Sequence, residues 1–123
     1  MSSDSTTTIH DLKEFVRAFR DERDWLQFHD PKNLAEAISI EASELLELFL
    51  WKDTQTSRTS LEGDKRLRAS VEEELADILC FCLNFANTAK IDVSTAVKKK
   101  IAANKLKYPI ERAKGSAKKY DKL

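Results

Sequence analysis

Apolar residues recur every three or four positions over most of the chain, the spacing that one face of an α-helix requires. The pattern predicts a first helix over residues 9–23, with Thr8 at its N-cap. A second helix is predicted over residues 31–51, because Asp30 can cap it and Pro31 suits its first turn. Both helices therefore combine an apolar stripe with a start signal.

The second half of the chain continues the pattern, with a third helix predicted over residues 65–89. A fourth helix is predicted to start after Asp92, a good capping residue, and to end near Tyr108, because Pro109 disfavours its continuation. Four helices with short connections are typical of a bundle, so the predicted fold class is all-α with a four-helix-bundle architecture.

The remaining segments lack helical spacing. Residues 52–63 are polar and contain Gly63, which predicts a loop. Residues 1–8 are rich in Ser and Thr and are predicted to be a disordered tail. The basic residues 110–123 are predicted to form a flexible tail or an arm, which leaves one helical domain over residues 9–109.

The second predicted helix is apolar on more than one side. Leu34, Ile38, Leu45 and Phe49 form one stripe, and a helix that is apolar on most sides is normally buried on most sides. A small chain offers limited cover, so we expect a homo-oligomer; scattered exposed apolar residues are the alternative. The apolar residues outside the stripe are Ile40, Leu46, Leu50 and Trp51.

Composition narrows the class of protein. The 123 residues include only 2 Gly and 2 Pro, which argues against a turn-rich β fold. Lys plus Arg equals Asp plus Glu, at 21 each, so the net charge gives no reason to expect a nucleic-acid partner. Cys80 and Cys82 point to different sides of a helix and do not pair, no stretch has the ~18 apolar residues of a membrane span, and no signal peptide is recognisable. We therefore expect a cytoplasmic protein without a membrane partner.

Acidic residues fall on the apolar sides of two predicted helices. Glu41 lies three residues after Ile38 and four before Leu45, inside the stripe, and Glu44 lies at its edge; Glu47 continues toward solvent. Each of the two helices thus presents an acidic pair at i and i+3. The second pair is Glu74 and Asp77 on the third helix.

Several carboxylates at a buried edge repel one another unless they are protonated, paired with basic groups or bound to a metal. An all-carboxylate oxygen set suits a hard cation such as Mg²⁺ or Mn²⁺. The alternative is that these acids are simply exposed, in a chain that is 34% charged. A di-iron or zinc site is not supported, because His10 and His29 lack the required spacing.

The same residues resemble the ExxE…ExxD signature of the MazG-like, all-α nucleoside triphosphate pyrophosphohydrolases, and in particular their dCTP pyrophosphatase branch. The resemblance covers residues 12–121. Its motifs are EASE (41–44), ELAD (74–77), ERDWLQFHDPKNL (22–34), ELLELFLWK (44–52), EEELADIL (72–79), KYP (107–109) and KKY (118–120).

This resemblance implies a helical bundle that assembles as a dimer or a dimer of dimers, a homotetramer, with active sites at subunit interfaces. It implies hydrolysis of a nucleoside triphosphate to the monophosphate and pyrophosphate, which clears surplus or non-canonical nucleotides. Glu41 and Glu47 are the candidates to activate water. The implied Mg²⁺ ligands are Glu41, Glu44, Glu74 and Asp77.

The resemblance also implies a substrate site, whose base and sugar pocket is formed by aromatic and polar side chains. Val16 and Phe81 stand where animal dCTP pyrophosphatases are expected to have His and Tyr, so the base preference stays open, with dCTP or modified dCTP as the expected substrate. The implied substrate-binding residues are Trp25, Gln27, Phe28, His29, Trp51, Phe81, Lys100, Asn104 and Tyr108.

Two alternatives remain at this point. One is a related enzyme that acts on dUTP or phosphoribosyl-ATP, against which the DWxQFH segment (24–29) argues. The other is a helical dimerisation or nucleotide-binding module without turnover. The complete set of four acids argues against that module, because a protein that only binds has no need for all four.

Overall fold

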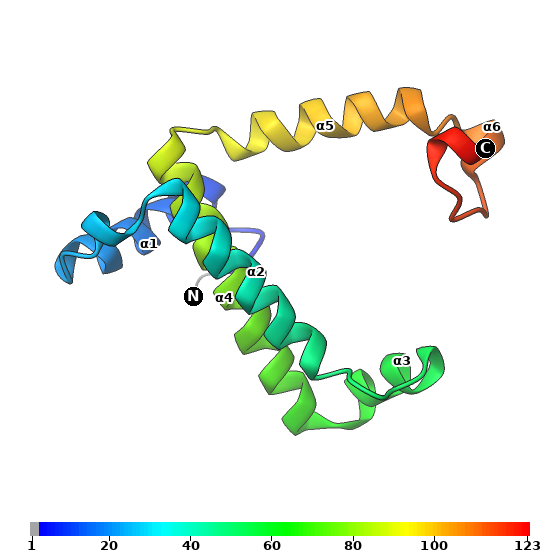
Figure 1. Ribbon diagram of the computed structural model, residues 1–123, viewed down its shortest axis with the longest axis horizontal. Helices are drawn as coiled ribbons and strands as arrows, with labels where there is room; N and C mark the ends of the chain where they lie inside the picture. The colour runs from blue at the N-terminus through cyan, green and yellow to red at the C-terminus, as the bar shows by residue number, and fades with distance from the viewer. Residues whose placement is uncertain (1–2) are drawn as a thin grey trace. The chain divides into compact units, whose positions relative to one another are not determined.

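A computed structural model describes residues 3–123, all of whose regular elements are helical (Figure 1). The all-α fold class is therefore confirmed for the described residues. In chain order the elements are α1 (Ile9–Glu22), η1 (Leu26–Phe28), α2 (Pro31–Glu47), α3 (Thr54–Gly63), α4 (Lys65–Ala89), α5 (Val93–Lys107), α6 (Ile110–Ala113) and η2 (Tyr120–Lys122).

The starts of the predicted helices are confirmed by their caps. Thr8 and Asp11 form a capping box at α1, in which each side chain accepts a hydrogen bond from the other residue's backbone N–H. At α2 and α5 the cap is a single aspartate: Asp30 and Asp92 each accept a hydrogen bond from the backbone N–H three residues later. These side chains satisfy N–H groups that a helix start leaves without partners.

The second helix ends earlier than predicted. After Glu47 the backbone tightens, so that the N–H groups of Leu48, Phe49 and Leu50 donate to carbonyls three residues back. Trp51 then has a φ of 66°, in the left-handed region, which ends the turn.

The prediction of a loop over residues 52–63 is wrong, because Thr54–Gly63 forms helix α3. The segment has too few apolar residues to show a helical stripe. Local hydrogen bonds define the helix instead: Asp53 accepts from Thr56 N–H at 2.7 Å, and the Ser60 hydroxyl donates to the Thr56 carbonyl. The sequence pattern also missed the short helix α6.

Two compact units make up the chain, Met1–Lys90 and Ile91–Leu123. In the first, α4 packs against α1, α2 and α3, and most extensively against α2, which runs antiparallel beside it (Figure 1). Leu34 on α2 is 1% exposed and lies in a small core with Leu83 and Ala86 of α4.

The second unit contains α5, α6 and η2. The Tyr120 ring packs edge-on against Tyr108, with 6.1 Å between ring centroids, and the Lys107 ammonium lies 4.9 Å from the Tyr120 centroid. These contacts fold the C-terminal segment back on the end of α5. The helix predicted after Asp92 is thereby confirmed as α5, and the domain bounds 9–109 stay a prediction.

Three further features bear on the predictions. In the tail predicted to be disordered, Thr6 and Thr7 donate backbone hydrogen bonds to the Ser3 carbonyl, while residues 1 and 2 lie outside the described part of the chain. Among the described residues, no helix is both long and apolar enough to cross a membrane. The extra apolar residues of the second helix, Ile40, Leu46, Leu50 and Trp51, are exposed in the single chain.

Candidate functional site

Three of the four predicted metal ligands come together between α2 and α4. Glu41 and Glu44 are one turn apart on α2, and Glu74 lies on the neighbouring stretch of α4. Each offers a carboxylate oxygen, and the three oxygens lie within 4.8 Å of one another. The antiparallel packing of the two helices therefore joins acids that are about 30 residues apart in sequence.

Two oxygens of this group have no partner. Glu41 Oε2 and Glu74 Oε2 are buried and receive no hydrogen bond from the described residues. A buried carboxylate oxygen without a donor is costly. The oxygen-only donor set, with two buried oxygens that lack a donor, fits a hard divalent cation such as Mg²⁺.

The acids also perturb one another. Burial, followed by the hydrogen bond and charge of Glu44, raises the pKa of Glu41 to about 7. Burial and Glu44 raise the pKa of Glu74 in the same way. Like charges that share a site favour protonation, and a cation removes that penalty.

Asp77, the fourth predicted ligand, lies outside the group of three carboxylates and lines a neighbouring pocket. The pocket has a volume of about 460 Å³ and is bounded by α1, the segment after it, and α4. Its apolar wall includes Phe19 and Trp25, whose rings meet edge-on at 5.7 Å. The other apolar lining residues are Phe15, Val16 and Phe81.

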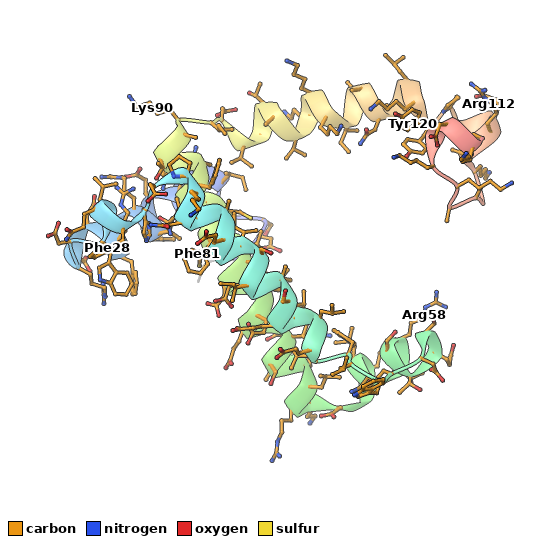
Figure 2. The ribbon with its side chains drawn as sticks, in the orientation of Figure 1. Phe28, Arg58, Phe81, Lys90, Arg112 and Tyr120 are labelled. Carbon is orange, nitrogen blue, oxygen red and sulfur yellow. The ribbon has the colours of Figure 1, made fainter. Side chains whose placement is uncertain are left out.

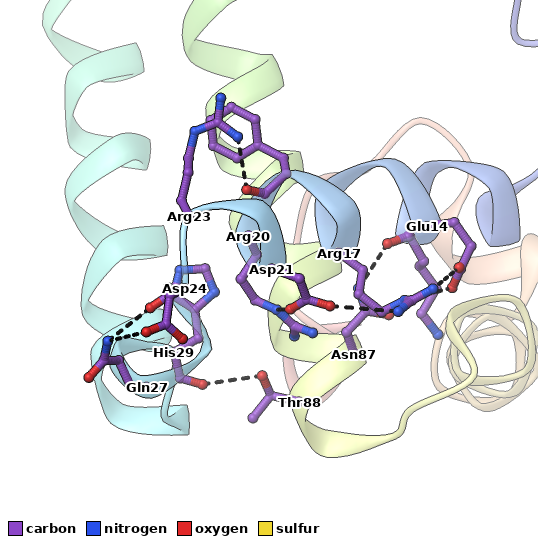
Figure 3. A network of polar contacts seen from close by, with 12 residues as sticks. Glu14, Arg17, Arg20, Asp21, Arg23, Asp24, Gln27, His29, Asn87 and Thr88 are labelled. Atoms are coloured by element: carbon purple, nitrogen blue, oxygen red, sulfur yellow. Dashed lines mark hydrogen bonds and ion pairs between the residues drawn. The ribbon is translucent and has the colours of Figure 1, made fainter.

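Polar side chains form the rest of the wall. Arg20 is only 6% exposed, and its Nε donates to Asp21 Oδ1 at 2.8 Å (Figure 3). Burial and the charge of Arg20 lower the pKa of His29, which favours the neutral imidazole. Burial and the Asp77 charge raise the pKa of the Cys80 thiol. Asn84 completes the lining.

Two long-range hydrogen bonds hold this wall in place (Figure 3). The Thr88 hydroxyl donates to the His29 carbonyl at 3.2 Å, and Asn87 Nδ2 donates to the Lys13 carbonyl at 3.0 Å. Both donors are near the end of α4. They fix α1 and the His29 segment against that helix.

The structure thus brings three predicted substrate residues into one pocket: Trp25, His29 and Phe81. Sequence reasoning missed the contributions of Arg20 and Asn84. Asn84 had a detectable signal, because it lies seven residues after Asp77 and therefore on the same helical face. A buried Arg within an amphipathic helix has no comparable signal.

Other predicted residues lie apart from the pocket in the single chain. Gln27 Nε2 donates to the carbonyl and carboxylate of Asp24, and Phe28, after α1, is 59% exposed (Figure 2). Glu47 is exposed, and Trp51 is 95% exposed. Their roles stay predictions.

The predicted phosphate and sugar residues belong to the second unit. Lys100 and Asn104 are one turn apart on α5, and Tyr108 follows at its C-cap. The spacing of four residues places all three on one side of the helix. Their part in a site also stays a prediction.

Comparison with known proteins gives consistent matches. A model of the MazG-like family matches residues 37–123. The chain is 38% identical over 122 residues to dCTP pyrophosphatase 1 of Bos taurus. This match covers 99% of the present chain and 72% of the bovine protein. It is 38% identical over 116 residues to dCTP pyrophosphatase 1 of Homo sapiens, covering 94% and 68% of the two chains.

A solved structure matches as well. The crystal structure of a pyrophosphatase from Archaeoglobus fulgidus DSM 4304 superimposes with a TM-score of 0.76 at 43% sequence identity. The match covers 82% of this chain and 92% of the other.

Proposed function

The chain belongs to the MazG-like family, and from this premise we propose that it hydrolyses dCTP or modified dCTP to the nucleoside monophosphate and pyrophosphate, with Mg²⁺ as cofactor. Its relatives in cattle and humans are dCTP pyrophosphatases, and the archaeal neighbour is a pyrophosphatase. The chain is accordingly an enzyme of the nucleotide pyrophosphohydrolase class.

One observation carries the proposal. One carboxylate oxygen from each of Glu41, Glu44 and Glu74 lies within 4.8 Å of the others. Two of these residues also have a buried oxygen for which the described part of the chain supplies no hydrogen-bond donor. Asp77, one turn after Glu74 on α4, lines the adjacent aromatic pocket. A cation-binding group and a base-sized pocket thus share one helix, as a nucleotide with its phosphates at one end requires.

We assign the three glutamates, with Asp77, as the groups that would hold Mg²⁺ or Mn²⁺. When bound, the cation would offset the negative charge of the phosphates and the charge that builds up during hydrolysis. Glu41 or Glu47 would accept a proton from the attacking water.

The pocket would hold the base. Trp25 and Phe19 offer ring faces and edges for stacking, which provides affinity for any base. Val16 and Phe81 are apolar, so base selection falls to the few polar groups of the wall. Tight water exclusion around the base would strengthen any hydrogen bond made there.

Assembly is part of the proposal. Trp51 and the apolar side chains of Ile40, Leu46 and Leu50 are exposed in the single chain. A second copy of the chain that covers these side chains would form a homo-oligomer, and the proposed state is a dimer of dimers. In this assembly Trp51 would reach a substrate pocket. Lys100, Asn104 and Tyr108 would then contact phosphates and sugar. A cytoplasmic location completes the proposal.

Pyrophosphate release from a panel of deoxynucleoside triphosphates tests this function. We expect release with Mg²⁺, none with EDTA, and the highest kcat/KM for dCTP or a 5-modified dCTP. If no nucleotide releases pyrophosphate in the presence of Mg²⁺, the proposed hydrolysis is wrong and the chain is a binding module without turnover. If all the nucleotides are hydrolysed with equal kcat/KM, the proposed reaction is supported and the proposed preference for dCTP is wrong.

A further inference from the structure

Two buried polar atoms of the pocket wall find no hydrogen-bond partner among residues 3–123. They are Asn84 Oδ1 and His29 Nδ1, in side chains that both line the pocket. Asn84 is only 7% exposed, so bulk water does not satisfy its amide oxygen. A buried acceptor without a donor is costly, and such atoms in a pocket indicate a ligand that supplies the missing partner.

The position of Asn84 on α4 gives the ligand an orientation. Asp77, Cys80, Phe81 and Asn84 follow at i, i+3, i+4 and i+7, so they line one face of the helix. Asp77 lies toward the glutamate group, and Asn84 lies about 10 Å further along the axis. A nucleotide with its phosphates near the acids would therefore place its base near Asn84.

Few other groups of the wall can distinguish bases. Phe15, Val16, Phe19, Trp25 and Phe81 are apolar or aromatic and contact any ring. The Arg20 Nε–H group donates a hydrogen bond to Asp21, and the guanidinium offers only hydrogen-bond donors. The amide oxygen of Asn84 is an acceptor, and it complements a donor on the base.

We propose that Asn84 Oδ1 accepts a hydrogen bond from the exocyclic amino group of the base, with His29 Nδ1 contacting the same base edge, so that the pocket selects cytosine over uracil and thymine. Cytosine carries an amino donor at the position where uracil and thymine carry a carbonyl acceptor. An acceptor facing that carbonyl would leave both oxygens without a donor and repel. This inference rests on the proposed function and names the residue that sets its base preference.

Substitution of Asn84 tests the inference. Asn84→Leu keeps the size of the side chain and removes the acceptor; Asn84→Asp keeps an acceptor and removes the amide donor. The kcat/KM ratio of dCTP to dUTP should be about tenfold or more in the wild type. It should fall to within about threefold of unity in Asn84→Leu and be retained in Asn84→Asp.

A control on the same helix is Cys82→Leu, two residues before Asn84, at a half-buried side chain that does not line the pocket. It should leave the base ratio unchanged even if it lowers thermal stability. Calorimetric binding of dCMP and dUMP, which need no hydrolysis, gives a second reading of the same ratio for each variant that remains folded by circular dichroism.

The outcomes separate the two proposals. Pyrophosphate release from any nucleotide with Mg²⁺ supports the proposed function, whatever Asn84 does. If Asn84→Leu lowers dCTP and dUTP turnover equally, or leaves their ratio unchanged, Asn84 does not select the base. Loss of the ratio in Asn84→Asp as well would show that the amide donor, not its oxygen, makes the contact, and would overturn the inference.

Discussion

Glu41 of α2 and Glu74 of α4 offer carboxylate oxygens that lie within 4.8 Å of each other and of one from Glu44. Each of the two residues also has a buried Oε2 that finds no hydrogen-bond partner among the described residues. Two such oxygens would repel if both residues were ionised without a cation. This pair links the packing of the two longest helices of the first unit to the proposed chemistry.

Metal binding should depend on pH. Burial and Glu44 raise the pKa of Glu41 from its ordinary value of 4.5 to about 7. In the metal-free protein the resulting stability is present below pH 4.5 and is lost as the pH rises to about 7, because the folded state binds the proton more tightly. Mg²⁺ requires the ionised carboxylates, so its affinity should increase from about pH 6 to about pH 8.

Thermal unfolding with EDTA or Mg²⁺ at these two pH values checks this prediction. Mg²⁺ at about 100 times its Kd should stabilise the fold by about 2.7 kcal/mol. At a fixed Mg²⁺ concentration, the rise in Tm should be larger at the higher pH. Glu41→Gln removes the titrating group and should flatten the difference. An equal Tm rise at both pH values in the wild type would contradict the role of Glu41.

Removal of one carboxylate should abolish most of the turnover. Glu74→Gln preserves the size of the side chain but removes a charge that would hold Mg²⁺, and kcat/KM should fall about 100-fold or more. Glu73→Gln is the matched control, because Glu73 is the adjacent exposed residue of α4 and the charge change is the same. Steady-state pyrophosphate release from both variants gives the comparison; similar losses would indicate a general charge effect.

The aromatic wall should contribute to affinity more than to the chemical step. Trp25→Ala removes a ring that packs against Phe19 at 5.7 Å in the pocket wall. Loss of base stacking is expected to raise KM for dCTP by about 10- to 100-fold, with a smaller change in kcat. A fall in kcat at constant KM would place Trp25 outside the base pocket.

Trp51 provides a test of assembly, because its side chain is 95% exposed in the single chain. If a second copy brings it to a pocket, Trp51→Ala should raise KM by about tenfold. Leu46→Glu, at an exposed apolar position of α2, should give a monomer by light scattering and raise KM similarly. Ser39→Glu adds the same charge at an exposed polar position and should leave the oligomer intact.

An active Leu46→Glu monomer with unchanged KM would show that one chain holds the complete site. A wild-type protein that is monomeric at assay concentrations would have the same consequence. Either result would remove Trp51 from the proposed substrate contacts while leaving the glutamate group unaffected.

The sequence predicted those features that local physics decides. The apolar period located α1, α2, α4 and α5, and the Thr8, Asp30 and Asp92 caps marked the starts of three of them, because each signal lies within a few residues of the element it defines. The phase of Glu41 within its stripe predicted that the acid would face a neighbouring helix. Helix α3 was not predicted, because its stability comes from the Asp53 cap and hydroxyl hydrogen bonds rather than from an apolar stripe.

Less of the pocket wall was predicted from the sequence. The burial of Arg20 and Asn84 depends on how α1 packs across α4, a long-range contact that no local pattern encodes. Trp25 and His29 were predicted only through family resemblance, since an aromatic turn before a helix also serves as packing. Their unsatisfied neighbour Asn84 became visible only once the hydrogen bonds of the fold were known.

In the proposed reaction, the Glu41, Glu44 and Glu74 group supports hydrolysis between the α- and β-phosphates of a nucleotide. Phosphorus NMR of dCTP incubated with the protein and Mg²⁺ tests it most directly, because the spectrum distinguishes pyrophosphate from orthophosphate. We predict dCMP and pyrophosphate in equal amounts with the wild type, their formation about 100-fold slower or more with Glu74→Gln, and unchanged dCTP with EDTA. Formation of dCDP and orthophosphate, or equal turnover by Glu74→Gln, would contradict the account.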